Sequence, residues 1–225
     1  MKYMKGILLL SGFYFAFFST CSAEANFYRH FYPNNNKEYG TNEVRIGELI
    51  NNRRLIKTKF QETENPENIS NSESLLDQNY ELIQTRIRKD HIDSDYQVRK
   101  ADQFVFIFGK RKGKLINKKL KLTDTPFFWD PKLGLSGFVK SSKASLVFQV
   151  IRPDNQEVYE MEAERIGLKN ININGKEVSA VEVYWTLTGF LSIFFDQTYY
   201  YRASDGLFLT QKKSFESKTM ELIIK

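Results

Sequence analysis

The sequence predicts a mainly β fold: a curved antiparallel meander that forms an open or incomplete barrel, with few short helices. Three observations favour this fold. Apolar and polar residues alternate with a period of two over many short runs, and the runs are rich in β-branched and aromatic residues. Turn dipeptides separate the runs, so neighbouring strands are expected to pair antiparallel. We expect about nine to twelve strands in a single β domain over residues 41–225.

The expected strands follow one another at short intervals. The first two lie at residues 44–50 and 55–60 and are joined at Asn51-Asn52. Residues 61–74 are polar, contain a proline and have no apolar face, which predicts a long loop. The other strand-like runs lie at 82–88, 104–108, 115–122, 146–151, 158–163, 171–173, 178–187, 199–202, 206–210 and 220–224. One or two helical turns are expected at 75–80 and at 132–140.

The turns between the later runs have a clear chemistry. Asn174-Gly175 and Asp205-Gly206 are dipeptides that tolerate positive φ, which is typical of tight β-hairpins. Pro153-Asp154-Asn155 predicts a further turn. Two of the expected strands, 104–108 and 189–195, are apolar on both faces and therefore need cover on both sides. A sheet that curves around an apolar interior would supply that cover.

Residues 1–25 have the features of an export signal peptide. Lys2 and Lys5 precede an apolar run at 6–18, which is shorter than the ~20 residues of a membrane-spanning helix. Ala23-Glu24-Ala25 is a small-x-small cleavage site. The protein is therefore expected to be exported, and residues 26–40, which show no periodicity, are expected to be a flexible arm or tether.

Cys21, the single cysteine of the chain, leaves two alternatives open. It is either discarded with the leader, giving a soluble periplasmic protein, or acylated, giving a membrane-anchored lipoprotein. Phe18 and Thr20 fit only a relaxed version of the lipoprotein signal, which favours simple cleavage. In both cases the folded body has no thiol, so disulfides, cysteine nucleophiles and thiolate metal sites are excluded.

The sequence contains no recognisable catalytic signature, so we expect no catalytic residues, no cofactor and no metal site. His30 lies in the arm and His91 in a polar turn, and neither has a neighbour at metal-ligand spacing. Loss of the leader changes the formal net charge from +6 to +5, because Lys2, Lys5 and Glu24 are removed. For an exported protein, this basic charge favours anionic lipid or polysaccharide surfaces as partners over nucleic acid. The alternative, which the composition favours, is ordinary solubilising surface charge.

A basic cluster at residues 110–121 contains no acidic residue. Its first members, which we consider candidates for contact with an anionic membrane surface, are Lys110, Arg111, Lys112 and Lys114. The alternative is a lysine-guarded edge strand, since charged edges prevent strands of different molecules from pairing. The cluster lacks interleaved aromatic residues, which argues against binding to nucleic acid.

Aromatic residues make up 15% of the chain, and two groups of them suggest an apolar ligand. The candidates for lining a sheet concavity are Phe127, Phe128, Trp129, Trp185, Phe190, Phe194 and Phe195. The alternative is ordinary core packing, which large aromatic side chains dominate in most proteins.

Three stretches, TPFFWDPKLGLSGFV, ERIGLKNININGKEVSAVEVYW and TYYYRASDGLFLTQKK, resemble a family of uncharacterised bacterial exported proteins. That family is similar in fold to the bacterial lipoprotein-localisation carriers, whose incomplete barrel encloses acyl chains. The resemblance covers residues 40–225 approximately, and it implies a half-barrel fold but no functional residue.

Two functions of different class remain. The first is an exported cell-envelope protein that binds a lipid, acyl chain or other apolar ligand in the concavity of the sheet. The second is a non-enzymatic structural or envelope-interaction protein with a packed interior. The sequence does not address the oligomeric state.

The leader generates a first prediction. We expect the mature protein to begin at or near Asn26, to appear in the periplasmic fraction and to take up no radiolabelled palmitate. Palmitate incorporation by the native protein, lost in a Cys21→Ala variant, would contradict cleavage and establish the lipoprotein alternative.

Overall fold

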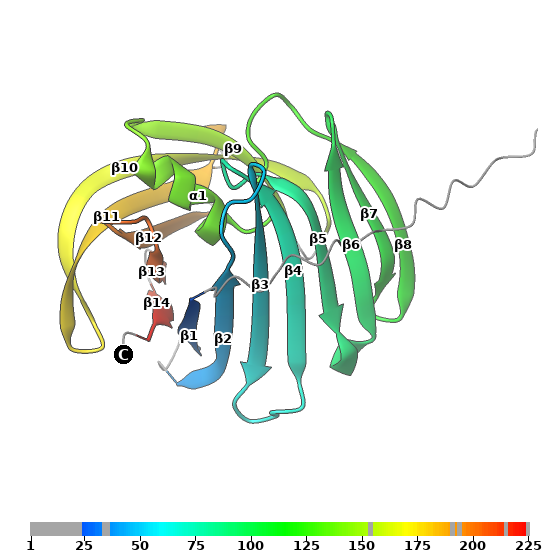
Figure 1. Cartoon of the computed structure of the whole chain (residues 1–225), viewed down its shortest axis with the longest axis horizontal. Helices are drawn as coiled ribbons and strands as arrows, with labels where there is room; N and C mark the ends of the chain where they lie inside the picture. The colour runs from blue at the N-terminus through cyan, green and yellow to red at the C-terminus, as the bar shows by residue number, and fades with distance from the viewer. Residues whose placement is uncertain are drawn as a thin grey trace, which may run out of the picture.

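The strands of this protein form one continuous antiparallel sheet that does not close on itself (Figure 1). The computed structural model describes residues 24–32, 37–152, 155–189, 192, 195–213 and 216–223. Within these residues the sheet has fourteen strands, and a single short α-helix accompanies it. The predicted fold class is confirmed, although the sheet has more strands than the nine to twelve expected.

The sheet consists of two meanders. The first contains β1 (Ala25–Phe31), β2 (Glu38–Ile46), β3 (Arg53–Glu62), β4 (Ile69–Asp77), β5 (Leu82–Lys89), β6 (Ser94–Ala101), β7 (Phe104–Arg111) and β8 (Lys114–Lys121), with a 3₁₀ turn η1 (Asp90–Ile92) before β6. The second contains β9 (Ser145–Ile151), β10 (Val158–Ile173), β11 (Lys176–Leu187), β12 (Asp196–Arg202), β13 (Phe208–Lys213) and β14 (Glu216–Leu222). The helix α1 (Pro131–Lys140) lies between the meanders in sequence.

The hairpin turns predicted from the dipeptides are confirmed. Asn174 (φ 52°) and Gly175 (φ 82°) join β10 to β11, and Gly206 (φ 71°) lies between β12 and β13. Each strand pairs with the strands before and after it in sequence, except that β8 and β9 do not pair with each other. These two strands form the two edges of the sheet.

The two meanders are joined by the pairing of β1 with β14, whose partners include Tyr28 with Leu222. The Tyr28 hydroxyl donates a hydrogen bond to the Phe208 carbonyl at 3.0 Å, which ties β1 to β13 as well. The Asn174 side-chain amide donates to the Leu222 carbonyl at 2.7 Å, so the β10–β11 turn supports the same junction. We call this junction, β1 with β14, the seam.

Four expectations are corrected by these elements. No helical turn forms at residues 75–80, where β4 ends at Asp77 and a turn leads to β5. Residues 26–40, expected to be a flexible arm, contain β1 and the start of β2, because β1 finds hydrogen-bonding partners on both sides. Residues 61–74 are not one long loop, since β4 begins at Ile69. The expected strand at 189–195 is absent from its described residues, which connect β11 to β12. Residues 1–23, including Cys21, lie outside the described residues.

The helix α1 matches the expectation of helical turns at 132–140. Its N-terminus is capped by Asp130, whose carboxylate accepts from the Lys132 amide at 3.0 Å, and Pro131 is its first residue. At its C-terminus the Arg165 guanidinium donates to the carbonyls of Phe138 and Val139 at 3.0 and 2.8 Å. This placement of a cation favours the negative end of the helix dipole. Within the described part of the chain, no helix has the length and apolar character to span a membrane.

Next to the seam, His30 occupies a largely buried position on β1. Its ring packs edge-on against Phe60, with centroids 5.2 Å apart, and its Nδ1 lies 3.4 Å from the Tyr39 hydroxyl. Burial, with a smaller contribution from the positive charge of Lys132, lowers the pKa of His30 to about 4. The folded protein therefore holds this imidazole neutral at pH values where the unfolded chain protonates it.

We predict that acid weakens the seam through His30. Because the pKa is about 6.5 when unfolded and about 4 when folded, the free energy of unfolding should fall by about 3 kcal/mol as the pH drops through that window. A His30→Phe variant should lose this share of the acid sensitivity in urea titrations at several pH values. His91→Gln, at an exposed position, is the matched control. Identical acid sensitivity in wild type and His30→Phe would contradict the assignment.

Candidate functional site

The aromatic candidates for a ligand site lie in the interior of the molecule. Phe127, Phe128 and Trp185 are 0%, 3% and 5% exposed. Trp129 and Phe195 are partly buried and pack against the same core. The other two candidates, Phe190 and Phe194, lie outside the described residues.

The structure brings these rings together as a packed cluster. Phe148 of β9 stands between Phe128 and Trp185, with ring centroids 5.3 and 6.0 Å away. Trp185 in turn packs on Phe195 at 5.1 Å and on Tyr199 at 5.2 Å. These separations are those of direct aromatic contacts. Phe128, Trp185 and Phe195 are thus linked by ring contacts through Phe148, and the described members of the set belong to one hydrophobic core.

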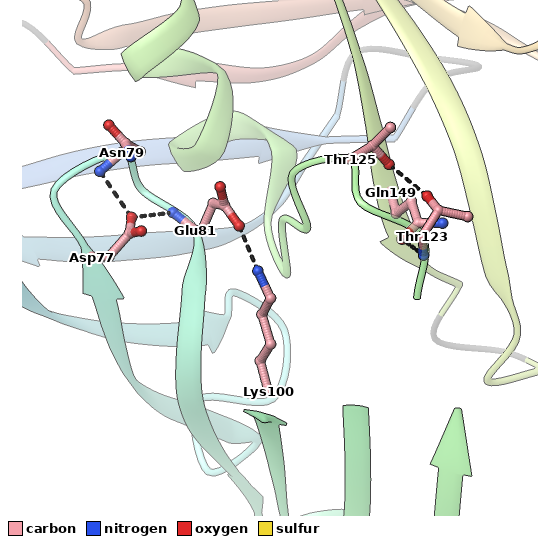
Figure 2. A network of polar contacts seen from close by, with 7 residues as sticks. All are labelled: Asp77, Asn79, Glu81, Lys100, Thr123, Thr125 and Gln149. Atoms are coloured by element: carbon pink, nitrogen blue, oxygen red, sulfur yellow. Dashed lines mark hydrogen bonds and ion pairs between the residues drawn. The ribbon is translucent and has the colours of Figure 1, made fainter. Parts of the chain in front are cut away.

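The segment before α1 positions Phe127 and Phe128 by covering the edge of β9. The Phe128 amide donates to the Gln149 carbonyl at 2.9 Å, and the Gln149 amide donates to the Pro126 carbonyl at 2.7 Å. The Gln149 side chain accepts from the Thr123 amide at 3.1 Å, beside the contact between Thr123 and Thr125 (Figure 2). This segment also reaches the first meander, since the Leu82 amide donates to the Phe127 carbonyl at 3.2 Å.

A cavity of about 610 Å³ opens between α1, the turn from β4 to β5 and the segment at residues 126–128. We call it the mouth cavity. Its lining residues are Arg54, Gln78, Asn79, Tyr80, Glu81, Pro126, Phe128, Gly137, Phe138, Lys140, Ser141, Lys143 and Leu146. The lining combines apolar side chains with several cations, and its volume falls in the range of small-molecule sites.

The β4–β5 turn at this cavity is held firmly by Asp77. One oxygen of its carboxylate accepts from the amides of Asn79 and Glu81 at 2.8 and 2.9 Å (Figure 2). The Glu81 carboxylate is itself engaged by Lys100 at 2.6 Å (Figure 2). The wall of the cavity that contains Tyr80 is thus fixed by hydrogen bonds on both sides.

The face of β2–β8 that points away from the interior is basic, and we call it the outer face. Cross-strand register places its side chains in rows, for example Arg45, Lys57, Glu73 and Arg86. Three outer-face residues are acidic, namely Glu43, Glu73 and Asp95. The outer-face cations are Arg45, Lys57, Lys59, Arg86, Arg88, Arg99, Lys110, Lys119 and Lys121. The three carboxylates each form an ion pair, at 2.5 Å (Glu43), 3.2 Å (Glu73) and 2.6 Å (Asp95). A groove of about 440 Å³ runs along this face.

The four basic residues predicted from the sequence lie at the β7–β8 hairpin. Lys110 forms an ion pair with Asp93 at 2.5 Å, so part of its charge is neutralised. The Lys112 amide donates to the Ser94 hydroxyl at 2.8 Å, which ties the turn to β6. The side chains of Lys112 and Lys114 are exposed, and that of Arg111 is half-buried.

The sequence analysis missed an apolar component beside this hairpin. On the outer face Phe104 pairs with Lys121, and Phe106 with Lys119. The Lys119 ammonium lies 3.8 Å from the centroid of the Phe104 ring, a cation–π contact. Leu115 shares this face and is 89% exposed. The signal was present as the alternate residues of FVFIF, but only the register of β7 with β8 brings them next to lysines.

The two histidines of the chain lie in different places and do not form a common site. His91 is exposed in η1, whereas His30 is partly buried at the seam. In the described ranges, no three His, Cys, Asp or Glu residues come close enough to hold a metal ion.

Comparison with known proteins shows similarity in fold alone. No protein-family model and no curated protein matches the sequence. Among solved structures, the chain is similar to a beta-barrel-like protein of the domain of unknown function DUF1849 from Brucella abortus, with a TM-score of 0.52 and 10% identity over 88% of this chain and 94% of that one. The hypothetical lipoprotein YmcC from Escherichia coli matches with a TM-score of 0.37 and 11% identity over 89% of this chain and 84% of that one.

The packing of Phe128 against α1 generates a prediction about two helix glycines. A Cβ on Gly134 would lie 2.5 Å from Cδ1 and 2.7 Å from Cβ of Phe128, whereas one on Gly137 would lie no closer than 3.2 Å to its nearest neighbour. We expect Gly134→Ala to lower the free energy of unfolding by about 2 kcal/mol in urea titrations, because the ring must move. Gly137→Ala, which gains the same helix propensity, should change it by less than about 1 kcal/mol. Equal effects would show that the ring is not packed against Gly134.

Proposed function

We propose that this protein is a non-enzymatic component of the cell envelope that binds an anionic membrane surface through the outer face of β7 and β8. The observation that carries the proposal is the patch formed by Phe104, Phe106, Leu115, Lys119 and Lys121, which we call the β7–β8 patch. It combines the exposed Leu115 and two half-buried phenylalanines with lysines that form no ion pair with a described carboxylate.

This combination suits the interface of an anionic bilayer. Aromatic side chains are favourable at the level of the lipid headgroups. Each lysine near an anionic leaflet contributes about 1 kcal/mol. Leu115, near the hairpin tip, supplies an apolar side chain that can enter the headgroup region. The other outer-face cations, such as Arg99 and Lys59, extend the same positive field across the sheet.

Export is part of the proposal and rests on the leader-like residues 1–25. The mature protein would be periplasmic, or anchored as a lipoprotein if Cys21 is acylated. Binding through the patch holds the protein at a membrane without requiring that anchor, which agrees with the cleavage alternative.

The packed aromatic cluster supports the envelope-interaction function over ligand binding inside the sheet. Phe127, Phe128 and Trp185 occupy the space that a ligand in the concavity would need, and moving them would sacrifice buried contacts. A carrier that encloses acyl chains would require an interior free of such contacts.

The proposal predicts salt-sensitive binding to vesicles. The protein should co-sediment with phosphatidylcholine vesicles that contain phosphatidylglycerol, and much less with phosphatidylcholine alone. Lys119→Gln together with Lys121→Gln should weaken binding about 30-fold, because two interfacial charges of about 1 kcal/mol each are lost. Lys169→Gln together with Lys176→Gln, on the second meander, is the control with equal loss of charge and should bind as the wild type does.

The contribution of the apolar groups is tested separately. Phe106→Ser should weaken vesicle binding while leaving the net charge unchanged. If both pairs of lysine substitutions weaken binding equally, attraction is due to net charge alone, and the patch is not the binding surface.

A further inference from the structure

The mouth cavity has a positively charged wall built around one tyrosine. Tyr80 is 8% exposed and has φ 66°, a conformation that bulky residues rarely adopt. The Tyr80 amide donates to the Asp77 carbonyl at 3.1 Å, and the Asp77 contacts described above complete the turn. Strained backbone of this kind persists where the surroundings enforce it, and it is concentrated at binding sites.

Arg54 of β3 forms a cation–π contact with this tyrosine. Its guanidinium carbon is 4.5 Å from the centroid of the Tyr80 ring. Its Nε is buried and has no hydrogen-bond partner among the described residues. An arginine donor that is removed from water without an acceptor is costly. Arg54 also lines the mouth cavity, where an anion would offset its positive charge.

Lys140 also contacts Tyr80. It is the last residue of α1, and its ammonium donates to the Tyr80 hydroxyl at 3.3 Å. Its side chain passes Gly206, where even a Cβ would lie 3.0 Å from the Lys140 Cε. Gly206 therefore leaves the space that lets this ammonium reach the cavity.

The carboxylates near these two cations are engaged elsewhere. Glu81 forms its ion pair with Lys100 at 2.6 Å. Asp205 accepts two hydrogen bonds from the Arg202 guanidinium, at 2.9 and 2.6 Å. Within the described parts of the chain, neither Arg54 nor Lys140 forms an ion pair. Hydrogen bonding from Arg202, with a smaller contribution from the charge of Lys140, lowers the pKa of Asp205, so this carboxylate compensates Lys140 only at a distance. With Lys143, the lining of the cavity contains three cationic side chains.

The lining also contains apolar side chains. They are those of Pro126, Phe128, Phe138 and Leu146, and Phe128 connects them to the aromatic cluster. A ligand with an anionic group at one end and an apolar chain at the other would satisfy both the cationic and the apolar lining residues.

We infer that the mouth cavity binds an amphiphile whose anionic end, a carboxylate or a phosphate monoester, lies against Arg54, Tyr80 and Lys140, and whose apolar chain lies against Phe128 and Leu146. This site is separate from the β7–β8 patch. It differs from the site that the aromatic residues suggested, because the ligand occupies the opening of the barrel and leaves the core in place.

Calorimetric titration of the full mature chain tests the inference with simple probes below their micelle concentrations. Dodecanoate and dodecyl phosphate should bind, whereas dodecyltrimethylammonium, acetate and inorganic phosphate should not. Equal binding of the cationic detergent would overturn the anionic part of the inference. Binding of inorganic phosphate as strong as that of dodecyl phosphate would overturn the apolar part.

Variants identify the residues. Arg54→Gln and Lys140→Gln should each weaken dodecanoate binding tenfold or more, because each removes a charged donor. Lys119→Gln, in the β7–β8 patch, is the control and should bind dodecanoate as the wild type does. Arg54→Gln should keep full binding to anionic vesicles, so failure of this inference is distinguishable from failure of the proposed function. Wild-type affinity for dodecanoate in both cavity variants, confirmed as folded by circular dichroism, would overturn the site.

Discussion

The structure depends on the pairing of β1 with β14. Each meander on its own has one apolar face, and a single curved sheet cannot bury that face. The seam joins the meanders edge to edge, so that the sheet can curve and the inner faces cover each other. Tyr28 contributes on both counts, since its backbone is part of the seam and its buried ring packs on Phe208 of the second meander.

The sequence predicted the local parts of this fold well. Asn174-Gly175 specified a hairpin because both residues must adopt positive φ, and no distant contact is needed for that. Likewise, Asp130-Pro131 starts α1 through its own capping contacts. The seam could not be predicted in this way. In β1 the polar residues Arg29 and His30 obscure the period of two, and its partner β14 lies at the other end of the chain.

The difference between local contacts and contacts distant in sequence also explains which parts of the candidate sites could be predicted. Sequence identifies side chains that avoid water, and Phe127, Phe128 and Trp185 do come together. It does not tell whether such side chains surround a space or fill it, because that depends on Phe148 and on the contacts that hold the segment before α1. The β7–β8 patch and the charged wall of the mouth cavity arise from register and from a turn, so neither forms a continuous stretch of sequence.

The seam also has a consequence for the order of folding. The hairpins within each meander bring together residues that are near in sequence, whereas Tyr28 meets Leu222 only when almost the whole chain is present. Loop closure over such a length is entropically costly, and contacts of this kind slow folding. We therefore expect the seam to form last. Until it does, strand residues that end up buried, such as Ile56 and Val183, are exposed to other unfolded chains, so we expect the yield of refolding to fall as the protein concentration rises.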